Sequence, residues 1–123
     1  MEFRSLTRYV LVLRHETMFQ SIQLIVTGDD PNVANGKPAP DIYLEAAKRL
    51  GVHPSKCLVF EDAITGAQSG KSAGCHVVAV PDYRMEKDPF LSVSDEILDS
   101  MWQFSGERWG ISLDMEGGEE MRC

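Results

Sequence analysis

The stretch that decides the fold is Cys57–Val80, CLVFEDAITGAQSGKSAGCHVVAV, in which two short apolar runs flank a segment of helical length. The runs Cys57–Phe60 and His76–Val80 do not alternate apolar with polar residues, a pattern typical of strands covered on both faces in a parallel sheet. Between them we predict a helix over about Ala63–Ser72, ended by Gly74. A strand, a helix and a strand of these lengths predict a βαβ unit.

The same alternation of elements extends toward the N-terminus. The apolar runs Tyr9–Leu13 and Leu24–Thr27 are two further predicted strands. Between Pro40 and Gly51 the apolar residues recur at helical spacing: Tyr43, Ala46, Ala47 and Leu50. Pro40 suits the first turn of this helix, and Gly51 suits its end. We therefore predict an α/β fold with a partial Rossmann-like, three-layer core and a mostly parallel sheet.

Composition limits the classes of function. The 123 residues are 43% hydrophobic and carry a formal net charge of −7, and the acidic excess lies mainly in residues 84–123. An acidic chain without a basic stripe is not expected to bind nucleic acid. No apolar run approaches the roughly 20 residues of a membrane span, so we expect no membrane association. Three cysteines without metal-binding spacing indicate reduced thiols, and hence a cytoplasmic protein.

Charged residues follow the predicted strands, where α/β sheets place their sites. Glu61 and Asp62 come directly after the apolar run that ends at Phe60. Two adjacent carboxylates at a strand end favour a hard cation such as Mg²⁺. Taken alone, the pair is equally compatible with a helix N-terminus favoured by the helix dipole.

A second loop, residues 28–41, carries Asp29 and Lys37. A lysine in a loop stiffened by prolines suits the neutralisation of a phosphoryl group. Taken alone, Gly28-Asp29-Asp30-Pro31 is more typical of a turn than of a ligand site, and Lys37 indicates nothing. The joint order of these loops, strands and helices is what favours a site.

Three segments in that order resemble the haloacid-dehalogenase-like hydrolases, and most of all the branch of pseudouridine-5′-phosphatases and glycerol-3-phosphatases. They are Ile25–Asp30 (IVTGDD), Gly36–Leu44 (GKPAPDIYL) and Cys57–Ala63 (CLVFEDA). The resemblance divides the chain into an unmatched segment 1–14, a partial family core 15–110 and an acidic tail 111–123. We expect the tail to be disordered.

The resemblance implies Mg²⁺-dependent hydrolysis of a small phosphomonoester by way of an aspartate nucleophile. The catalytic lysine of the family maps onto Lys37, and its acidic metal ligands map onto Glu61 and Asp62. Asp29 resembles a loop residue near the site. The implied cofactor is Mg²⁺, and the implied partner is a small phosphorylated metabolite such as pseudouridine 5′-phosphate or glycerol 3-phosphate.

The nucleophile motif of the family, Asp-x-Asp-x-Thr or Asp-x-Asp-x-Val, is absent from this chain. Since nucleophilic catalysis requires a nucleophile, we assign none and expect the chain alone to be inactive. The alternative is a non-catalytic truncated isoform, a binding or regulatory module that pairs with itself or another protein through exposed sheet edges.

Two further expectations concern the ends of the chain. In the family the nucleophile strand neighbours the strand that here is Cys57–Phe60, and we expect Tyr9–Leu13 to occupy a vacated position. Trp102 and Trp109 are expected to anchor the C-terminal segment onto the sheet layer.

Overall fold

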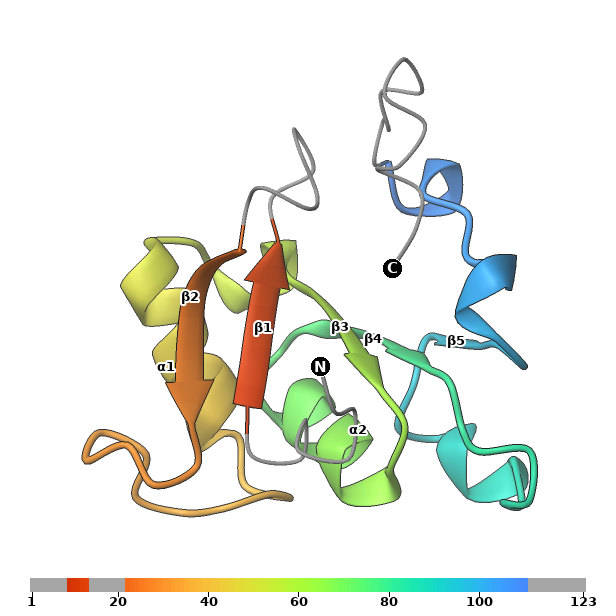
Figure 1. The fold of residues 1–123 in the computed structure, drawn as a ribbon, viewed down its shortest axis with the longest axis horizontal. Coiled ribbons are helices and arrows are strands. Elements are labelled where there is room, and N and C mark those ends of the chain that lie inside the picture. The colour runs from red at the N-terminus through yellow and green to blue at the C-terminus, as the bar shows by residue number, and fades with distance from the viewer. Residues whose placement is uncertain (1–8, 14–21, 111–123) are drawn as a thin grey trace.

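The computed structural model describes residues 9–13 and 22–110 of the chain. Its helices and strands are β1 (Tyr9–Leu13), β2 (Ile22–Thr27), α1 (Asp41–Leu50), β3 (Leu58–Glu61), α2 (Ile64–Ser72), β4 (His76–Ala79) and β5 (Glu96–Ile97) (Figure 1). Short 3₁₀ turns lie at Pro54–Lys56, Asp88–Phe90, Met101–Gln103 and Glu107–Trp109. The predicted tail 111–123 lies outside the described residues, as do residues 1–8.

The predicted βαβ unit is present. β3, β4 and β5 form a parallel sheet in that order. β3 pairs with β4 from Leu58 opposite His76 to Glu61 opposite Ala79, and α2 connects the two strands. A parallel pair needs such a crossover, because the chain must return to the same end of the sheet. The α/β class with a parallel sheet is therefore confirmed.

The ends of both helices follow the glycines and the proline of the sequence. Pro40 precedes the first residue of α1, and Gly51 ends the helix at φ +70°, donating its N–H to carbonyls of the last turn. Gly74, at φ +90°, follows the last turn of α2. Glycine adopts these left-handed conformations without the steric cost of a Cβ.

β1 and β2 form a separate two-stranded sheet, in which the strands run antiparallel with Val10 opposite Val26. The expected position of Tyr9–Leu13 beside β3 in a mostly parallel sheet is wrong. Residues 14–21 are too few for the crossover of ten or more residues that a parallel neighbour needs, but long enough for a reversal. Among the described strands, β3 therefore pairs only with β4.

α2 covers one face of β3, and α1 reaches the same face through Tyr43. A Cβ placed on Gly70 of α2 would lie 3.3 Å from Val59 Cγ1 and 2.9 Å from Val77 Cγ2. Glu61 lies on the same side of β3 as Val59, because side chains alternate along a strand. The hydroxyl of Tyr43 on α1 contacts Glu61, so α1 reaches this face as well.

The opposite face of β3 carries Phe60, which meets Phe104 edge to face with the ring centroids 4.9 Å apart. The described residues place no second helix layer on this face, so they form two of the three predicted layers. The core lies between the sheet and the two helices, and its buried apolar side chains include Val26, Ile42, Ala46, Val59, Ala67, Val77, Ala79 and Phe90.

The two tryptophans differ. Trp109 anchors the C-terminal segment as expected, because its Nε1 donates to Glu96 Oε1 at 2.8 Å and its ring lies 5.6 Å from that of His76. The expectation is wrong for Trp102, whose side chain is 80% exposed. No helix in the described ranges is long and apolar enough to cross a membrane.

Candidate functional site

Lys37 and Glu61 meet although 24 positions separate them: Lys37 Nζ lies 2.6 Å from Glu61 Oε1. The lysine comes from the loop after β2, and the glutamate is the last residue of β3. The fold thus joins the two predicted loops. Their side chains are only 9% and 6% exposed. A buried charge without a partner is strongly destabilising, so each side chain needs the other.

Two further residues fix the Glu61 carboxylate. The hydroxyl of Tyr43, on α1, donates to Glu61 Oε1. Burial, followed by the neighbouring Glu61 charge, raises the pKa of Tyr43 well above its usual value, so the phenol keeps its proton and acts as a donor. On the α2 side, a Cβ at Gly66 would overlap the carboxylate. Gly66 therefore leaves the space that Glu61 occupies.

Two aspartates order the loop that carries Lys37. Asp30 Oδ2 accepts from Arg49 Nη2 at 2.7 Å, and Oδ1 accepts from the backbone N–H of Asn32 at 2.9 Å. The hydrogen bond from Asn32, together with that from Arg49, lowers the pKa of Asp30. Asp41 Oδ2 accepts from both the backbone N–H and the side-chain amide of Asn35. The loop is thereby fixed to α1.

Ser69 fixes the same loop to α2. Its hydroxyl is fully buried and donates to the carbonyl of Ala39 at 2.7 Å. Sequence reasoning missed both Ser69, which is only a weak helix former in α2, and Tyr43, which belongs to the apolar stripe of α1. The signal for each was a polar atom on a residue that the helical pattern places toward the core.

The other two predicted site residues are exposed and lie outside this network. Asp29 Oδ1 accepts from Thr27 Oγ1 at 2.5 Å, and the described hydrogen bonds do not join Asp29 to Lys37 or Glu61. Asp62 follows Glu61 at the end of β3, with its side chain exposed. The structure therefore brings together Lys37 and Glu61, places Asp62 next in the chain, and leaves Asp29 in a turn of its own.

A family model described as haloacid dehalogenase-like hydrolase matches residues 7–74, a range that contains Lys37, Glu61 and Asp62. This chain belongs to the haloacid dehalogenase-like hydrolases. The recognition made from the three motifs is therefore confirmed. The family includes phosphatases that act on small phosphomonoesters.

Named relatives support this assignment. The chain is 46% identical over 101 residues to "(DL)-glycerol-3-phosphatase 1, mitochondrial" of Arabidopsis thaliana, which covers 80% of this chain and 34% of that protein. It is 44% identical over 101 residues to the "Probable pseudouridine-5'-phosphatase" of Drosophila melanogaster, covering 80% of this chain and 43% of that protein. The chain thus spans less than half the length of either relative.

A solved structure shares the architecture. A haloacid dehalogenase-like hydrolase of family IA, variant 3, from Entamoeba histolytica superposes with a TM-score of 0.55 at 36% identity. The superposition covers 63% of this chain and 35% of that chain. The parallel sheet and helices described above therefore match part of the haloacid dehalogenase-like fold.

The predicted Mg²⁺ ligands fit the ion only in part. Glu61 Oε1 already accepts from Lys37 and Tyr43, whereas Asp62 is exposed. Proteins commonly bind Mg²⁺ through one or two carboxylates, together with waters and substrate phosphates. Across residues 22–110 no group of three or more His, Cys, Asp or Glu side chains is placed to hold a metal. Of the two predicted ligands, Glu61 is thus already hydrogen-bonded, and Asp62 is the one with an exposed side chain.

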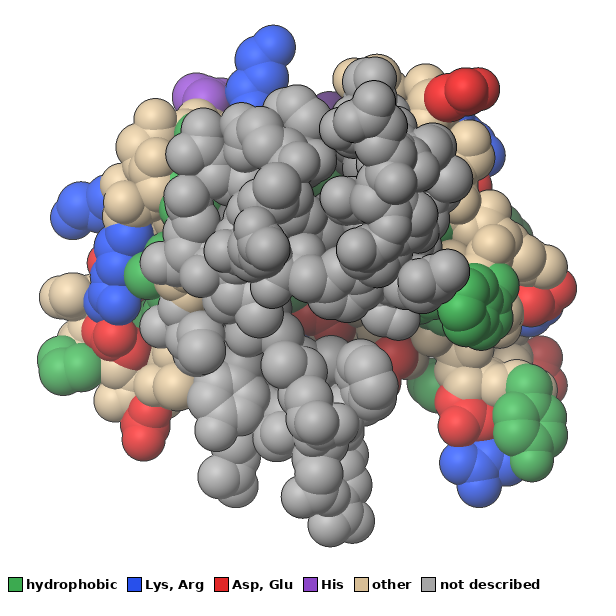
Figure 2. Space-filling model, turned by 45° about the horizontal axis from the view of Figure 1, so that its top comes forward, with side chains coloured by type: hydrophobic (Ala, Val, Ile, Leu, Met, Phe, Trp, Pro, Cys, Tyr) green, Lys and Arg blue, Asp and Glu red, His purple; other side chains and the backbone are tan. Residues whose placement is uncertain are grey.

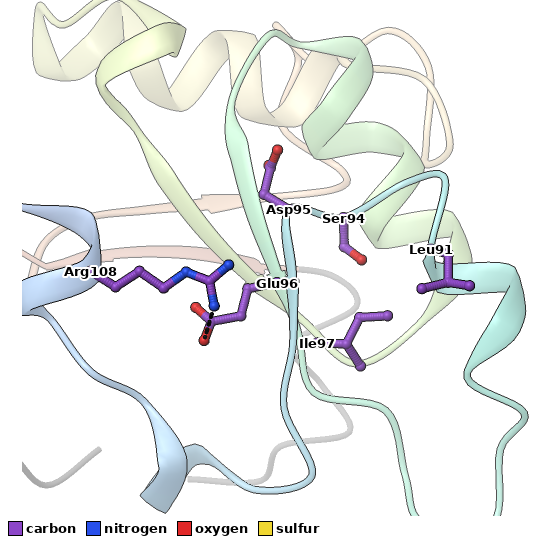
Figure 3. A pocket seen from close by; sticks show the side chains of 6 residues that line it. All are labelled: Leu91, Ser94, Asp95, Glu96, Ile97 and Arg108. Atoms are coloured by element: carbon purple, nitrogen blue, oxygen red, sulfur yellow. Dashed lines mark ion pairs between the residues drawn. The ribbon is translucent and has the colours of Figure 1, made fainter.

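A cavity of about 340 Å³ lies elsewhere in the chain, along β5 (Figure 3). It is lined by Leu91, Ser94, Asp95, Glu96, Ile97 and Arg108. Arg108 Nη1 pairs with Glu96 Oε2 at 3.2 Å across it. None of the four predicted site residues lines this cavity. The cavity is therefore separate from the candidate site, which is built on the Lys37–Glu61 pair.

The surface charges are mostly paired. On the face drawn in Figure 2, most visible lysine and arginine side chains stand beside acidic ones rather than in a continuous basic patch. Ion pairs such as Arg49–Asp30 and Lys71–Asp95 account for part of this distribution. Lys37 differs from these residues because its side chain is only 9% exposed.

Proposed function

We propose that this chain supplies the phosphate-binding part of a phosphomonoester hydrolase site, in which Lys37 neutralises the phosphoryl group. The observation that carries the proposal is the Lys37 side chain, only 9% exposed, with its ammonium 2.6 Å from Glu61 at the carboxyl end of the sheet. Membership of a family that includes phosphatases supports it. The names of the relatives favour a small phosphomonoester such as glycerol 3-phosphate or pseudouridine 5′-phosphate.

The chain's own residues would act by binding and orienting. An ammonium carries three N–H donors, and the described partners of Lys37 use one, through Glu61. The other N–H groups are available to phosphoryl oxygens, whose charge grows during transfer. Glu61 sets the position of the ammonium. A bound Mg²⁺ would neutralise further phosphoryl charge, and Asp62 would be the residue that holds it.

The same proposal includes inactivity of the chain by itself. Phosphoryl transfer of the kind implied by the family requires an aspartate nucleophile, and its motif is absent from this sequence. Among the described residues, the carboxylate that meets Lys37 is Glu61, which is already committed to two hydrogen bonds. The chain therefore binds the phosphoryl group without attacking it.

Binding and turnover are tested separately. Calorimetric titration with inorganic phosphate in the presence of Mg²⁺ should show binding by the wild type. Lys37→Ala should weaken it at least about tenfold, because a charge-assisted hydrogen bond is lost. The matched control is Lys48→Ala, at an exposed lysine of α1. An equal affinity in wild type and Lys37→Ala would contradict the assigned site.

Turnover is measured as Mg²⁺-dependent phosphate release from glycerol 3-phosphate and pseudouridine 5′-phosphate. We expect none from the chain alone. Clear turnover that Lys37→Ala abolishes would overturn the proposed inactivity while supporting the site.

A second candidate function is that of a binding module. The observation that favours it is the edge of β3 away from β4, with which no described strand pairs. An unpaired strand edge presents free N–H and C=O groups that can accept a strand from another polypeptide. The chain also spans only 34% and 43% of its two named relatives. The partner that would fit the free edge of β3 is a polypeptide that supplies the part of the relatives' fold that this chain does not span.

A further inference from the structure

Tyr43 contacts both members of the candidate site. Its hydroxyl donates to Glu61 Oε1, the same oxygen that Lys37 Nζ contacts. Lys37 Nζ also lies 5.4 Å from the centroid of the Tyr43 ring. We propose that Tyr43 is a positioning residue, which holds the Lys37 ammonium where a phosphoryl group binds. This inference rests on the proposed phosphate-binding role of Lys37.

Tyr43 is held rigidly enough for this role. The residue is 6% exposed and lies in the apolar stripe of α1, so packing in the core fixes its ring. α1 is itself joined to the loop of Lys37, through Arg49 and Asp30. The position of α1 therefore fixes the Tyr43 hydroxyl, and the hydroxyl in turn fixes Glu61 in the Lys37–Glu61 ion pair.

The shared oxygen has a consequence for ligand binding. When the other N–H groups of the Lys37 ammonium bind phosphoryl oxygens, Glu61 shares the ammonium with the phosphate and their contact weakens. A buried carboxylate with weakened donors is costly. The Tyr43 hydroxyl remains as a full donor to Glu61, and this lowers the cost of sharing the ammonium while it stays in position. The ring face stabilises the cation nearby, as aromatic rings do within about 6 Å.

Tyr43 has a positioning role and not a catalytic one. Its hydroxyl is buried and already donates to Glu61, so it does not reach a phosphoryl group directly. Removing the hydroxyl should therefore change the position of the Lys37 ammonium and lower the affinity for phosphate, while the packing of the Tyr43 ring is kept.

The decisive variant is Tyr43→Phe, which keeps the ring and removes the hydroxyl. Its matched control is Tyr83→Phe, at a tyrosine that is 88% exposed. The readout is the ¹⁵N–¹H NMR signal of the Lys37 ammonium, assigned by its loss in Lys37→Ala. We expect the signal to shift or broaden in Tyr43→Phe and to stay in place in Tyr83→Phe. An unchanged signal in Tyr43→Phe, with a native amide spectrum, overturns the proposal.

A measurement on the wild type keeps the test decisive if Tyr43→Phe does not fold. A hydroxyl proton held in a buried hydrogen bond exchanges slowly with water and resonates downfield. We expect such a proton from Tyr43, with a nuclear Overhauser contact to the Lys37 side chain. Its absence overturns the proposal.

Phosphate affinity separates this inference from the proposed function. Tyr43→Phe should weaken the binding of inorganic phosphate by about two- to tenfold, because Glu61 then lacks its second donor when the Lys37 ammonium binds phosphate, and Tyr83→Phe should not. Unchanged phosphate affinity in Tyr43→Phe would overturn the inference. Should the wild type bind no phosphate, the proposed function fails, whereas the Lys37 ammonium signal still decides whether Tyr43 positions it.

Discussion

At the scale of single residues, the candidate site depends on two hydroxyl groups that belong to helices. Tyr43 reaches Glu61 from α1, and Ser69 reaches the carbonyl of Ala39 from α2. Each hydroxyl joins a helix to a segment of the site. The position of Lys37 thus follows from core packing as well as from its own loop.

Ser69→Ala removes one of these connections. We expect the free energy of unfolding to fall by about 1 kcal/mol, the usual net value of such a hydrogen bond, and phosphate affinity to fall with it. Urea denaturation measures the first effect. The matched control is Ser72→Ala, at an exposed serine of the same helix, which should stay within about 0.5 kcal/mol of the wild type. Equal losses in the two variants would show that the Ser69 hydroxyl has no special role.

At the scale of elements, α2 is a poor helix by composition and a close-packed one in the structure. Its glycines weaken the helix by about 1 kcal/mol each relative to alanine. Gly66 leaves room for the Glu61 carboxylate, and Gly70 allows α2 to approach β3 and β4. The close approach of α2 to the sheet requires glycine at these two positions, although glycine lowers the helix propensity.

Gly70→Ala tests this interpretation. Helix propensity alone predicts a gain of about 1 kcal/mol. The added Cβ, however, would lie 2.9 Å from Val77 Cγ2 and 3.3 Å from Val59 Cγ1. Since overpacking costs about 1–3 kcal/mol, we expect a net loss of stability in thermal or urea unfolding. Gly36→Ala is the control, because a Cβ there would meet nothing within 4 Å. A more stable Gly70→Ala would contradict the close approach.

At the scale of the whole molecule, the chain matches part of the haloacid dehalogenase-like fold. The family match shows what this part belongs to, and the chain spans less than half of either named relative. Lys37 and Glu61 are present and paired, while the sequence contains no nucleophile motif. Two functions proposed for this chain can therefore be told apart by adding a second polypeptide. If the chain supplies part of a hydrolase site, a polypeptide with the nucleophile should restore phosphate release; if the chain is only a binding module, it should not.

We expect complementation with the portion of the Arabidopsis glycerol-3-phosphatase that lies outside the matched region. Mixed with this chain and Mg²⁺, that portion should form a complex in size-exclusion chromatography and release phosphate from glycerol 3-phosphate. The chain with Lys37→Ala should still form the complex but release no phosphate, because pairing depends on the edge of β3 and turnover on the lysine. Failure of the two polypeptides to associate would argue against an accessible edge at β3.

Much of the fold could be predicted from sequence because its signals are local. Among the described residues, the apolar runs predicted β1 to β4, and Pro40, Gly51 and Gly74 marked helix ends. The partner of Tyr9–Leu13 could not be predicted, because an apolar run indicates a strand without saying which strand it pairs with. The exposure of Trp102 was missed for the same reason, since its neighbours come from the tertiary fold.

The sequence by itself determined the family, the βαβ unit and the identity of Lys37, Glu61 and Asp62 as candidates, because motif order and spacing are properties of the chain. Only the tertiary structure decided which of them meet. It joined Lys37 to Glu61, added Tyr43 as a second donor to Glu61 and left Asp29 in a separate turn. The physical reason is that a buried charge selects its partners in space, where residues far apart in the chain become neighbours.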